Sequence, residues 1–165
     1  MARQYYTNGN CMVTLDGTEL GLSEAPISIS IVYHHLDIQV STWGGPNGGP
    51  AEVQAMGAEA MIAMTLIHFD TGQVQKAIRQ SFAGSSNGSM PAAGALMGGS
   101  SQFMALRMAS PVGGIPWNFP SAYLAQQPLS WPIGNERSAL QLNFRAIAYK
   151  SDPATMEAAV LYTHS

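Results

Sequence analysis

Four histidines and one cysteine are the side chains of this sequence best suited to metal binding or nucleophilic chemistry. His68 or His164 could complete a metal site with the adjacent pair His34 and His35. However, neighbouring residues on a β-strand point to opposite faces, so this pair is poorly placed to bind one ion. Cys11 has no recognisable neighbour that would activate its thiol. We interpret the histidines as structural or surface residues and Cys11 as a small strand residue.

The carboxylates of residues 1–72 are scattered, and no two have the spacing that general acid–base catalysis by a pair would need. They are Asp16, Glu19, Glu24, Asp37, Glu52, Glu59 and Asp70. Glycine-rich runs at 44–49 and 94–99 lack the lysine and hydroxyl residues of a phosphate-binding loop. The sequence therefore predicts no catalytic residue, no cofactor and no metal site, and a protein that is not an enzyme.

The low number of charges is the strongest compositional signal. Charged residues make up 10% of the 165 residues, although the apolar share of 46% is ordinary. About 25% charged residues is usual for a globular chain. Seven cations and a net charge of −3 disfavour a nucleic-acid-binding protein held by phosphate contacts. A surface with so few charges favours association with other chains.

The charges are also unevenly divided along the chain. Residues 1–72 contain one basic residue against seven acidic ones, whereas residues 73–165 contain six basic residues against three acidic ones. Opposite charges can meet head to tail between identical subunits, which is the contact that builds rings and stacks. They can equally neutralise each other within one subunit, and the sequence leaves both arrangements open.

Alternation of apolar and polar residues predicts strands in the first half of the chain. Residues 11–15 lead into Asp16-Gly17, a dipeptide typical of a tight hairpin turn. Residues 27–43 predict a long strand pair or one bent strand, followed by a glycine-proline loop at 44–50. Residues 61–69 favour a buried strand.

A helix is predicted at residues 72–83, because apolar residues recur there at helical spacing after a capping Asp70 or Thr71. The second half then alternates between long loops and strands. Residues 83–101 predict a loop and 102–108 a strand, and 110–131 predict an irregular segment whose aromatic residues must pack on this core or on another chain. Strands are expected again at 138–149 and 158–162.

These elements predict one domain spanning residues 1–165 with a mainly β fold. It is a β-sandwich or partly closed β-barrel of about seven strands, with one flanking α-helix and two long loops. The apolar stretch at 58–69 is shorter than the roughly 20 residues of a membrane helix. The polar N-terminus does not have the pattern of a signal peptide, so we expect neither a membrane segment nor export.

The order of elements resembles that of bacteriophage tail tube proteins and their relatives in contractile injection machines. A short strand at 13–15 with the Asp16-Gly17 turn precedes the strand pair at 27–43, and the strand at 61–69 leads into the helix at 72–83. The strand at 140–149 then leads to a closing Ala159-Val160-Leu161-Tyr162. The resemblance covers most of the chain.

In that family, a β-sandwich with one flanking helix forms hexameric rings, and the stacked rings enclose a β-lined channel for DNA or cargo. The resemblance thus implies a structural virion protein that assembles in the host cytoplasm. Its expected partners are further copies of itself, other tail proteins and DNA that passes without sequence-specific contact, with no membrane involved.

Two groups of residues are candidates for such a role. The expected contacts between subunits are Trp43, Gly44, Gly45, Pro46, Trp117, Phe119 and Trp131. The expected channel-facing residues are the polar positions of the long strands, either Asp37, Gln39 and Ser41 or Gln141 and Asn143. Arg145 is an awkward neighbour in the second set, because a cation would hold passing phosphates.

Two other classes of protein remain open. One is another virion component, such as a capsid decoration or baseplate protein, which would share the low charge and the exposed aromatic residues. The other is a small-ligand-binding β-barrel or an enzyme, with a pocket lined by Trp43, Trp117 and Trp131. The lack of convergent charged residues argues against catalysis.

Overall fold

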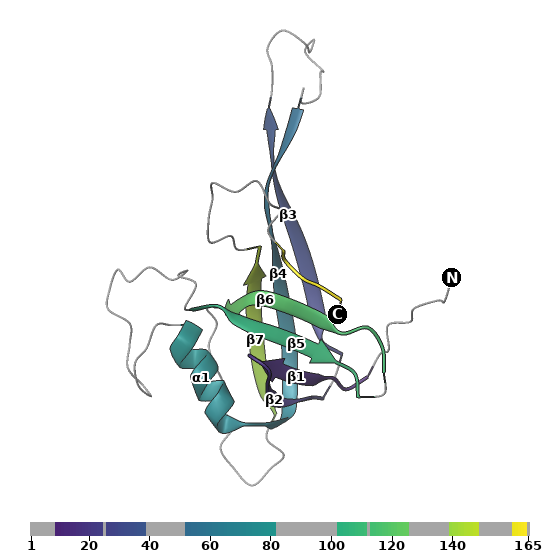
Figure 1. Cartoon of the computed structure of the whole chain (residues 1–165), viewed down its shortest axis with the longest axis vertical. Helices are drawn as coiled ribbons and strands as arrows, with labels where there is room; N and C mark the ends of the chain where they lie inside the picture. The colour runs from purple at the N-terminus through teal and green to yellow at the C-terminus, as the bar shows by residue number, and fades with distance from the viewer. Residues whose placement is uncertain are drawn as a thin grey trace.

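A computed structural model describes residues 9–24, 26–38, 52–81, 102–111, 113–125, 139–148 and 160–164. In this part of the chain, seven strands form one antiparallel sheet with a helix beside it (Figure 1). The elements are β1 (Met12–Leu15), β2 (Thr18–Ser23), β3 (Ser28–Ile38), β4 (Glu52–Phe69), α1 (Thr71–Ser81), β5 (Met104–Ala109), β6 (Trp117–Leu124) and β7 (Leu140–Ile147). The predicted mainly β fold with one flanking helix is confirmed.

The sheet closes partly on itself through β4. Its strand order is β2-β1-β5-β6-β7-β4-β3, and β2 pairs in addition with β4. β4 is long enough to carry both neighbours on one edge, with residues 52–63 beside β3 and residues 66–69 beside β2. β7 occupies the other edge of β4. Of the two architectures predicted, the structure has the partly closed barrel.

The N-terminal hairpin is held to the rest of the sheet by its turn. Asp16 and Gly17 both have positive φ angles, 49° and 78°, as the predicted tight turn requires. The Asp16 carboxylate accepts a hydrogen bond from the backbone N–H of Ala105 at 2.9 Å and pairs with the Lys76 ammonium at 2.8 Å. One side chain therefore ties the turn to β5 and to α1.

Closure of the sheet depends on a glycine in β2. Gly21 pairs with Phe69 at the end of β4. A Cβ atom at Gly21 would lie well inside van der Waals contact with the carbonyl oxygen of His68. The backbones of β2 and β4 can approach this closely because Gly21 has no side chain.

The core fills the inside of the curved sheet with alternate residues of its strands. In β7, Leu140, Leu142, Phe144 and Ala146 are buried, which confirms the predicted apolar face of this strand. The same alternation buries Met104, Leu106 and Met108 of β5 and Ala60, Ile62, Met64 and Leu66 of β4. Strand β4 begins at Glu52, nine residues before the predicted strand at 61–69.

The prediction of an irregular backbone for residues 110–131 is wrong in its middle, where β6 runs from Trp117 to Leu124. Pro120 has no N–H to offer a neighbouring strand. Pro120 lies at a position of β6 where no such N–H is needed. β7 pairs only with residues 122–124 of β6, and Thr163 near the C-terminus bridges Asn118, so neither partner reaches Pro120. Phe119 and Leu124 reach the core of their own chain.

Helix α1 begins at its predicted cap. The Asp70 carboxylate accepts a hydrogen bond from the backbone N–H of Gln73 at 3.1 Å. The helix buries Val74 and Ala77, and its last residue, Ser81, accepts a hydrogen bond from the backbone N–H of Leu124 at 2.8 Å. No helix in the described ranges has the length and apolar character needed to cross a membrane.

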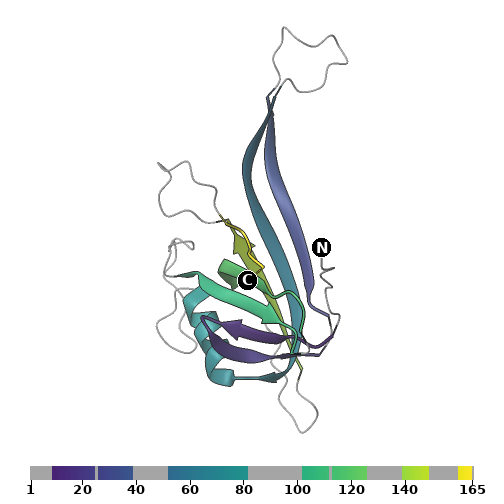
Figure 2. The ribbon, with the colours of Figure 1, turned by 45° about the vertical axis from the view of Figure 1, so that its right-hand side comes forward.

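The β3–β4 hairpin extends well past the other strands (Figures 1 and 2). The ladder between β4 and β7 ends at Glu59 and Ile147, whereas the ladder between β3 and β4 continues to Ile38 and Glu52. We call residues 32–38 and 52–57 the arm, and the partly closed sheet with α1 the body.

Candidate assembly and channel surfaces

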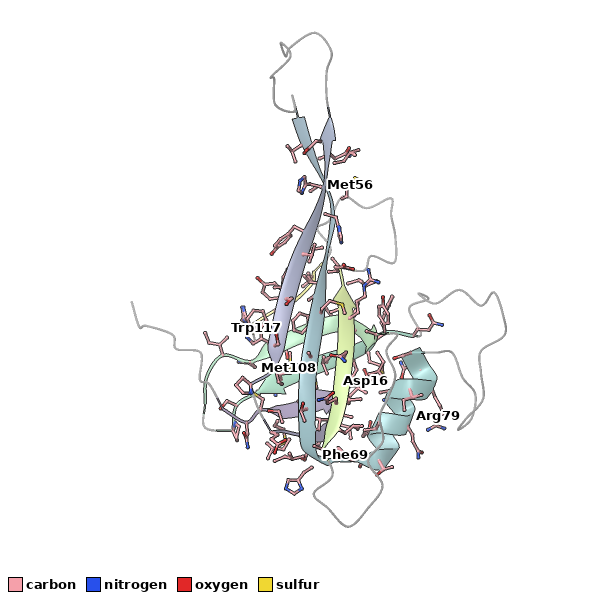
Figure 3. The ribbon with its side chains drawn as sticks, turned by 180° about the vertical axis from the view of Figure 1, so that it is seen from behind. Asp16, Met56, Phe69, Arg79, Met108 and Trp117 are labelled. Carbon is pink, nitrogen blue, oxygen red and sulfur yellow. The ribbon has the colours of Figure 1, made fainter. Side chains whose placement is uncertain are left out.

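The arm carries most of the exposed large apolar side chains of the described residues. Five of the six are Val32, Tyr33, Leu36, Val53 and Met56, and the sixth is Val160 near the C-terminus. Tyr33 is 66% exposed and Met56 is 61% exposed. Met56 lies on the arm, well separated from Met108 and Phe69 of the body (Figure 3). Solitary exposed apolar residues are ordinary, but a group of them on one projecting element is typical of a contact surface.

These apolar residues lie on both faces of the arm. Residues paired across antiparallel strands share a face, so Asp37 and Val53 lie together and Leu36 and Gln54 lie on the opposite side. An arm with apolar side chains on both faces can be covered from two sides. The described part of this chain leaves both sides exposed.

A β-bulge marks the middle of the arm. His34 pairs with Gly57 and His35 with Ala55, which leaves Met56 as the extra residue of β4. Gly57 has a φ of 146°, a backbone conformation that favours glycine. The bulge displaces the Met56 side chain from the regular alternation of the strand.

The outer face of β3, β4 and β7 is polar and carries few charges. Pairing places Ser28, Ala63 and Asn143 in one row across the three strands, and Thr65 and Gln141 in the next. These five residues line an open groove of about 300 Å³ together with Pro26 and Met64. Hydroxyl and amide groups therefore dominate this surface, which we call the polar face.

A charge cluster borders the polar face where the arm begins. Glu59 of β4 accepts hydrogen bonds through Oε2 from Nε of Arg145, at 2.7 Å, and from Nη2 of the same guanidinium. Its other oxygen, Oε1, lies 3.5 Å from Nε2 of His34 on β3. The three groups come from three adjacent strands, and only the register of the sheet brings them together.

Electrostatics holds Glu59 in its ionised form. The hydrogen bonds and the positive charge of Arg145 lower the pKa of Glu59, against the effect of its partial burial, and His34 adds a smaller effect. The hydrogen bond that Arg145 donates to Glu59 in turn raises the pKa of Arg145. The Arg145 that made the polar face an awkward channel lining is thus already paired with a carboxylate.

The two sets of predicted channel-facing residues do not share a surface. Gln141 and Asn143 lie on the polar face, as the register shows. Asp37 lies on the opposite face of β3 from Ser28 and Ser30, with its carboxylate 3.9 Å from His35. Gln39 and Ser41 lie outside the described residues.

The structure places two of the predicted contacts between subunits. Phe119 is fully buried in the core, so it is not available to a second copy in this structure. Trp117 is half-buried and contacts the rings of Tyr162 and His164, with centroids 5.0 and 4.3 Å away. It does not line the groove of the polar face. Trp43, Gly44, Gly45, Pro46 and Trp131 lie outside the described residues.

Two ion pairs join the acidic and basic halves of the sequence within one subunit. Asp16 pairs with Lys76, and Glu59 pairs with Arg145. This is the second of the two arrangements that the charge distribution left open. It reduces the charge available for a head-to-tail contact between copies.

The residues considered for chemistry are dispersed in the structure. His34 and His35 contact different carboxylates, Glu59 and Asp37. The described residues contain no group of three or more His, Cys, Asp or Glu that could hold a metal ion. Cys11 is half-buried before β1, and burial raises the pKa of its thiol, which disfavours the reactive thiolate.

No family model and no curated protein matches this chain. Among the solved structures that resemble it, two come from gene transfer agent particles. One comes from the virion of a native gene transfer agent particle, at 15% identity and a TM-score of 0.45 over 82% of this chain and 89% of that one. The other comes from the tail of an empty gene transfer agent particle of C6 symmetry, at 14% identity and a TM-score of 0.47 over 93% of this chain and 94% of that one.

The match to a gene transfer agent tail agrees with the tail tube resemblance of the sequence. At these identities and TM-scores, the likeness carries no argument about function. The functional evidence is the chain's own, namely the apolar arm, the polar face and the internally paired Arg145.

Proposed function

We propose that this protein is a structural subunit of a phage-like tail tube that assembles into stacked rings around a channel for DNA. The observation that carries the proposal is the arm, which leaves five large apolar side chains exposed beyond a complete core. The family resemblance implies hexameric rings. It implies also that the subunit works within the virion beside other tail proteins, without catalysing a reaction.

The arm supplies the driving force for assembly in this proposal. Burial of apolar surface contributes roughly 25 cal/mol per Å². The exposed arm side chains therefore stabilise any assembly that covers them. The arm projects from the body, so it can reach a neighbouring subunit while the body stays folded (Figure 2). The predicted contacts at Trp43 and at residues 44–46 belong to the same proposal.

The free edge of β3 supplies the lateral contact. Among the described residues, β3 pairs only with β4, so its other edge offers unpaired backbone groups over 11 residues. An exposed edge strand of this length is a template for pairing with another chain. Pairing between neighbouring subunits would join their sheets into the continuous β-lined wall that the resemblance implies.

The polar face is the proposed channel lining. Passing DNA carries phosphates that each lysine or arginine contact would hold electrostatically. Ser28, Thr65, Gln141 and Asn143 offer hydroxyl and amide groups instead of cations. Such a surface stays hydrated while placing little electrostatic hold on the DNA.

The test is to replace two apolar arm residues with serine and to examine assembly. The variant Leu36→Ser with Val53→Ser should keep the unfolding midpoint of the wild type, because both side chains are more than half exposed. It should no longer form the rings or tubes that electron microscopy and light scattering detect for the wild type. The matched control is Val160→Ser, which removes an apolar side chain of similar exposure outside the arm and should assemble normally.

Two results would count against the proposal. A wild-type protein that stays monomeric at tens of micromolar, at both low and moderate salt, is not a tube subunit. If it instead coats a capsid or a tail end without forming tubes, it is a decoration or baseplate component. Normal tubes from the arm variant would show that the arm is not the contact that drives assembly.

A further inference from the structure

Arg145 is the permanently charged cation of the polar face within the described residues. It lies directly opposite Met61 of β4 and two positions after Asn143, on the same side of β7 as the groove. Its side chain is 44% exposed. A guanidinium in such a place is a strong phosphate ligand, because its planar N–H groups match two phosphate oxygens at once.

Glu59 occupies one of the two edges of the guanidinium that can make such a contact. Both Nε and Nη2 of Arg145 donate to the same carboxylate oxygen. The Glu59 side chain is only 19% exposed, less than half the exposure of Arg145. His34 lies against the other carboxylate oxygen, so neighbours on two strands fix the position of Glu59.

We propose that Glu59 is a built-in counter-ion that prevents Arg145 from binding the phosphates of DNA at the polar face. The inference rests on the proposed function, since it takes the polar face to be where DNA passes. Glu59 acts through Arg145 and is thus a positioning and charge-compensating residue. A phosphate that approaches the Nε and Nη2 edge must displace this carboxylate, and the negative charge of Glu59 offsets the attraction of the guanidinium for a phosphate at its other edge.

The experiment measures binding of a fluorescent 30-base-pair duplex of random sequence to the purified protein, across salt concentrations and in the state in which it assembles. Glu59→Gln keeps the size of the side chain and removes its charge. We expect an affinity gain on the order of tenfold at low salt, and a steeper salt dependence by about one phosphate contact per subunit. The double variant Glu59→Gln with Arg145→Gln should return to the wild-type affinity.

Two further variants separate the proposed mechanism from simple changes in net charge. Glu19→Gln removes one negative charge from an exposed position of β2, outside the arm and the polar face, and should leave DNA binding unchanged. Ala63→Lys adds a cation to an exposed position of the polar face, with Glu59 and Arg145 intact, and should bind DNA as Glu59→Gln does. If Glu59→Gln does not fold, Glu59→Ala also removes the carboxylate beside Arg145 and should gain affinity in the same way.

The outcomes distinguish this inference from the proposed function. The inference is wrong if the folded Glu59 variant gains no affinity, if Glu19→Gln gains as much, or if the gain survives Arg145→Gln. If Ala63→Lys assembles and gains nothing, the polar face does not bind DNA, and that result contradicts the channel lining of the proposed function instead. Each of these results leaves tube formation untouched, because electron microscopy of the same samples reports assembly separately.

Discussion

The body and the arm share strand β4, yet its two ends meet different surroundings. Between residues 59 and 66, β4 pairs with β7, its other edge pairs with β3 up to residue 63 and with β2 from residue 66, and alternate side chains are buried in the core. Between residues 52 and 57 it pairs with β3 alone, and the described side chains of both strands are exposed there. The backbone ladder with β3 continues into the arm, with the bulge at Met56 as its irregularity.

The difference shows that hydrogen bonding within a hairpin and burial by a fold are separate contributions. A two-stranded ribbon satisfies half of its backbone groups but buries few side chains, and it is marginally stable by itself. The arm is thus the part of the chain whose apolar residues gain most from a partner. The body has its core already and gains little.

The largest expected contrast is between a buried and an exposed aromatic residue. Phe144→Ala in the body should lower the free energy of unfolding by about 3–5 kcal/mol, because Phe144 is fully buried. Tyr33→Ala on the arm should change it by less than about 0.5 kcal/mol. Urea unfolding of both variants checks this, and a cost above about 2 kcal/mol for Tyr33→Ala would mean that its own chain covers the arm.

The two strand glycines sharpen the same comparison through the backbone. Gly21→Ala places a methyl group against the carbonyl oxygen of His68 and should lower the free energy of unfolding by about 1–3 kcal/mol. At Gly57 an added methyl group meets open space. Gly57→Ala should therefore lower the free energy of unfolding by only about 1 kcal/mol, because alanine is strained at this positive φ angle. Thermal unfolding of both variants shows which one is destabilised more. Equal destabilisation would show that the closure of β2 on β4 does not depend on glycine at position 21.

Two carboxylates make a smaller contrast. Asp16→Ala removes the acceptor of the Ala105 N–H and the partner of Lys76, and should cost about 1–2 kcal/mol. Asp37→Ala on the arm removes an exposed carboxylate 3.9 Å from His35 and should cost less than about 0.5 kcal/mol. Chemical denaturation tests both, and an Asp16→Ala variant as stable as the wild type would contradict the role of this side chain.

The smallest effect lies at the boundary between body and arm and depends on pH. Arg145 lowers the pKa of Glu59 in the folded protein below its ordinary value of 4.5. The pair therefore stabilises the fold fully above that value, and the contribution is lost as the pH falls through the lowered pKa. Glu59→Gln should show a flatter loss of stability below about pH 4.5. Arg145→Gln should flatten it equally, and an unchanged acid dependence in Arg145→Gln would contradict the pairing.

The features that the sequence predicted well are those with local causes. The Asp16-Gly17 turn needs two residues that accept positive φ angles, and the helix cap needs a short acceptor at Asp70. The inner face of β7 follows from strict alternation over residues 140–146. On the candidate surfaces, the register confirms that Gln141 and Asn143 share one face, while their role in a channel stays a prediction.

The features that sequence reasoning missed depend on distant partners. Pro120 argued against a strand, and only the ends of β7 and the bridge at Thr163 show why β6 tolerates it. Glu59 was one of seven scattered carboxylates, and its partner Arg145 lies 86 residues away. One signal for this pair is their opposite charge at outward-facing positions of two strands. Nothing in the sequence gives the register that aligns them.

The sequence by itself determined which segments alternate, where the first hairpin turns, where the helix begins and how few charges the chain carries. Tertiary structure decided that β2 closes on β4, that two ion pairs join the acidic and basic halves within one subunit, and that apolar residues of the arm remain exposed. The physical reason is range. Dihedral preferences and hydrophobic periodicity act over a few neighbouring residues, whereas strand register and burial depend on which distant segments meet.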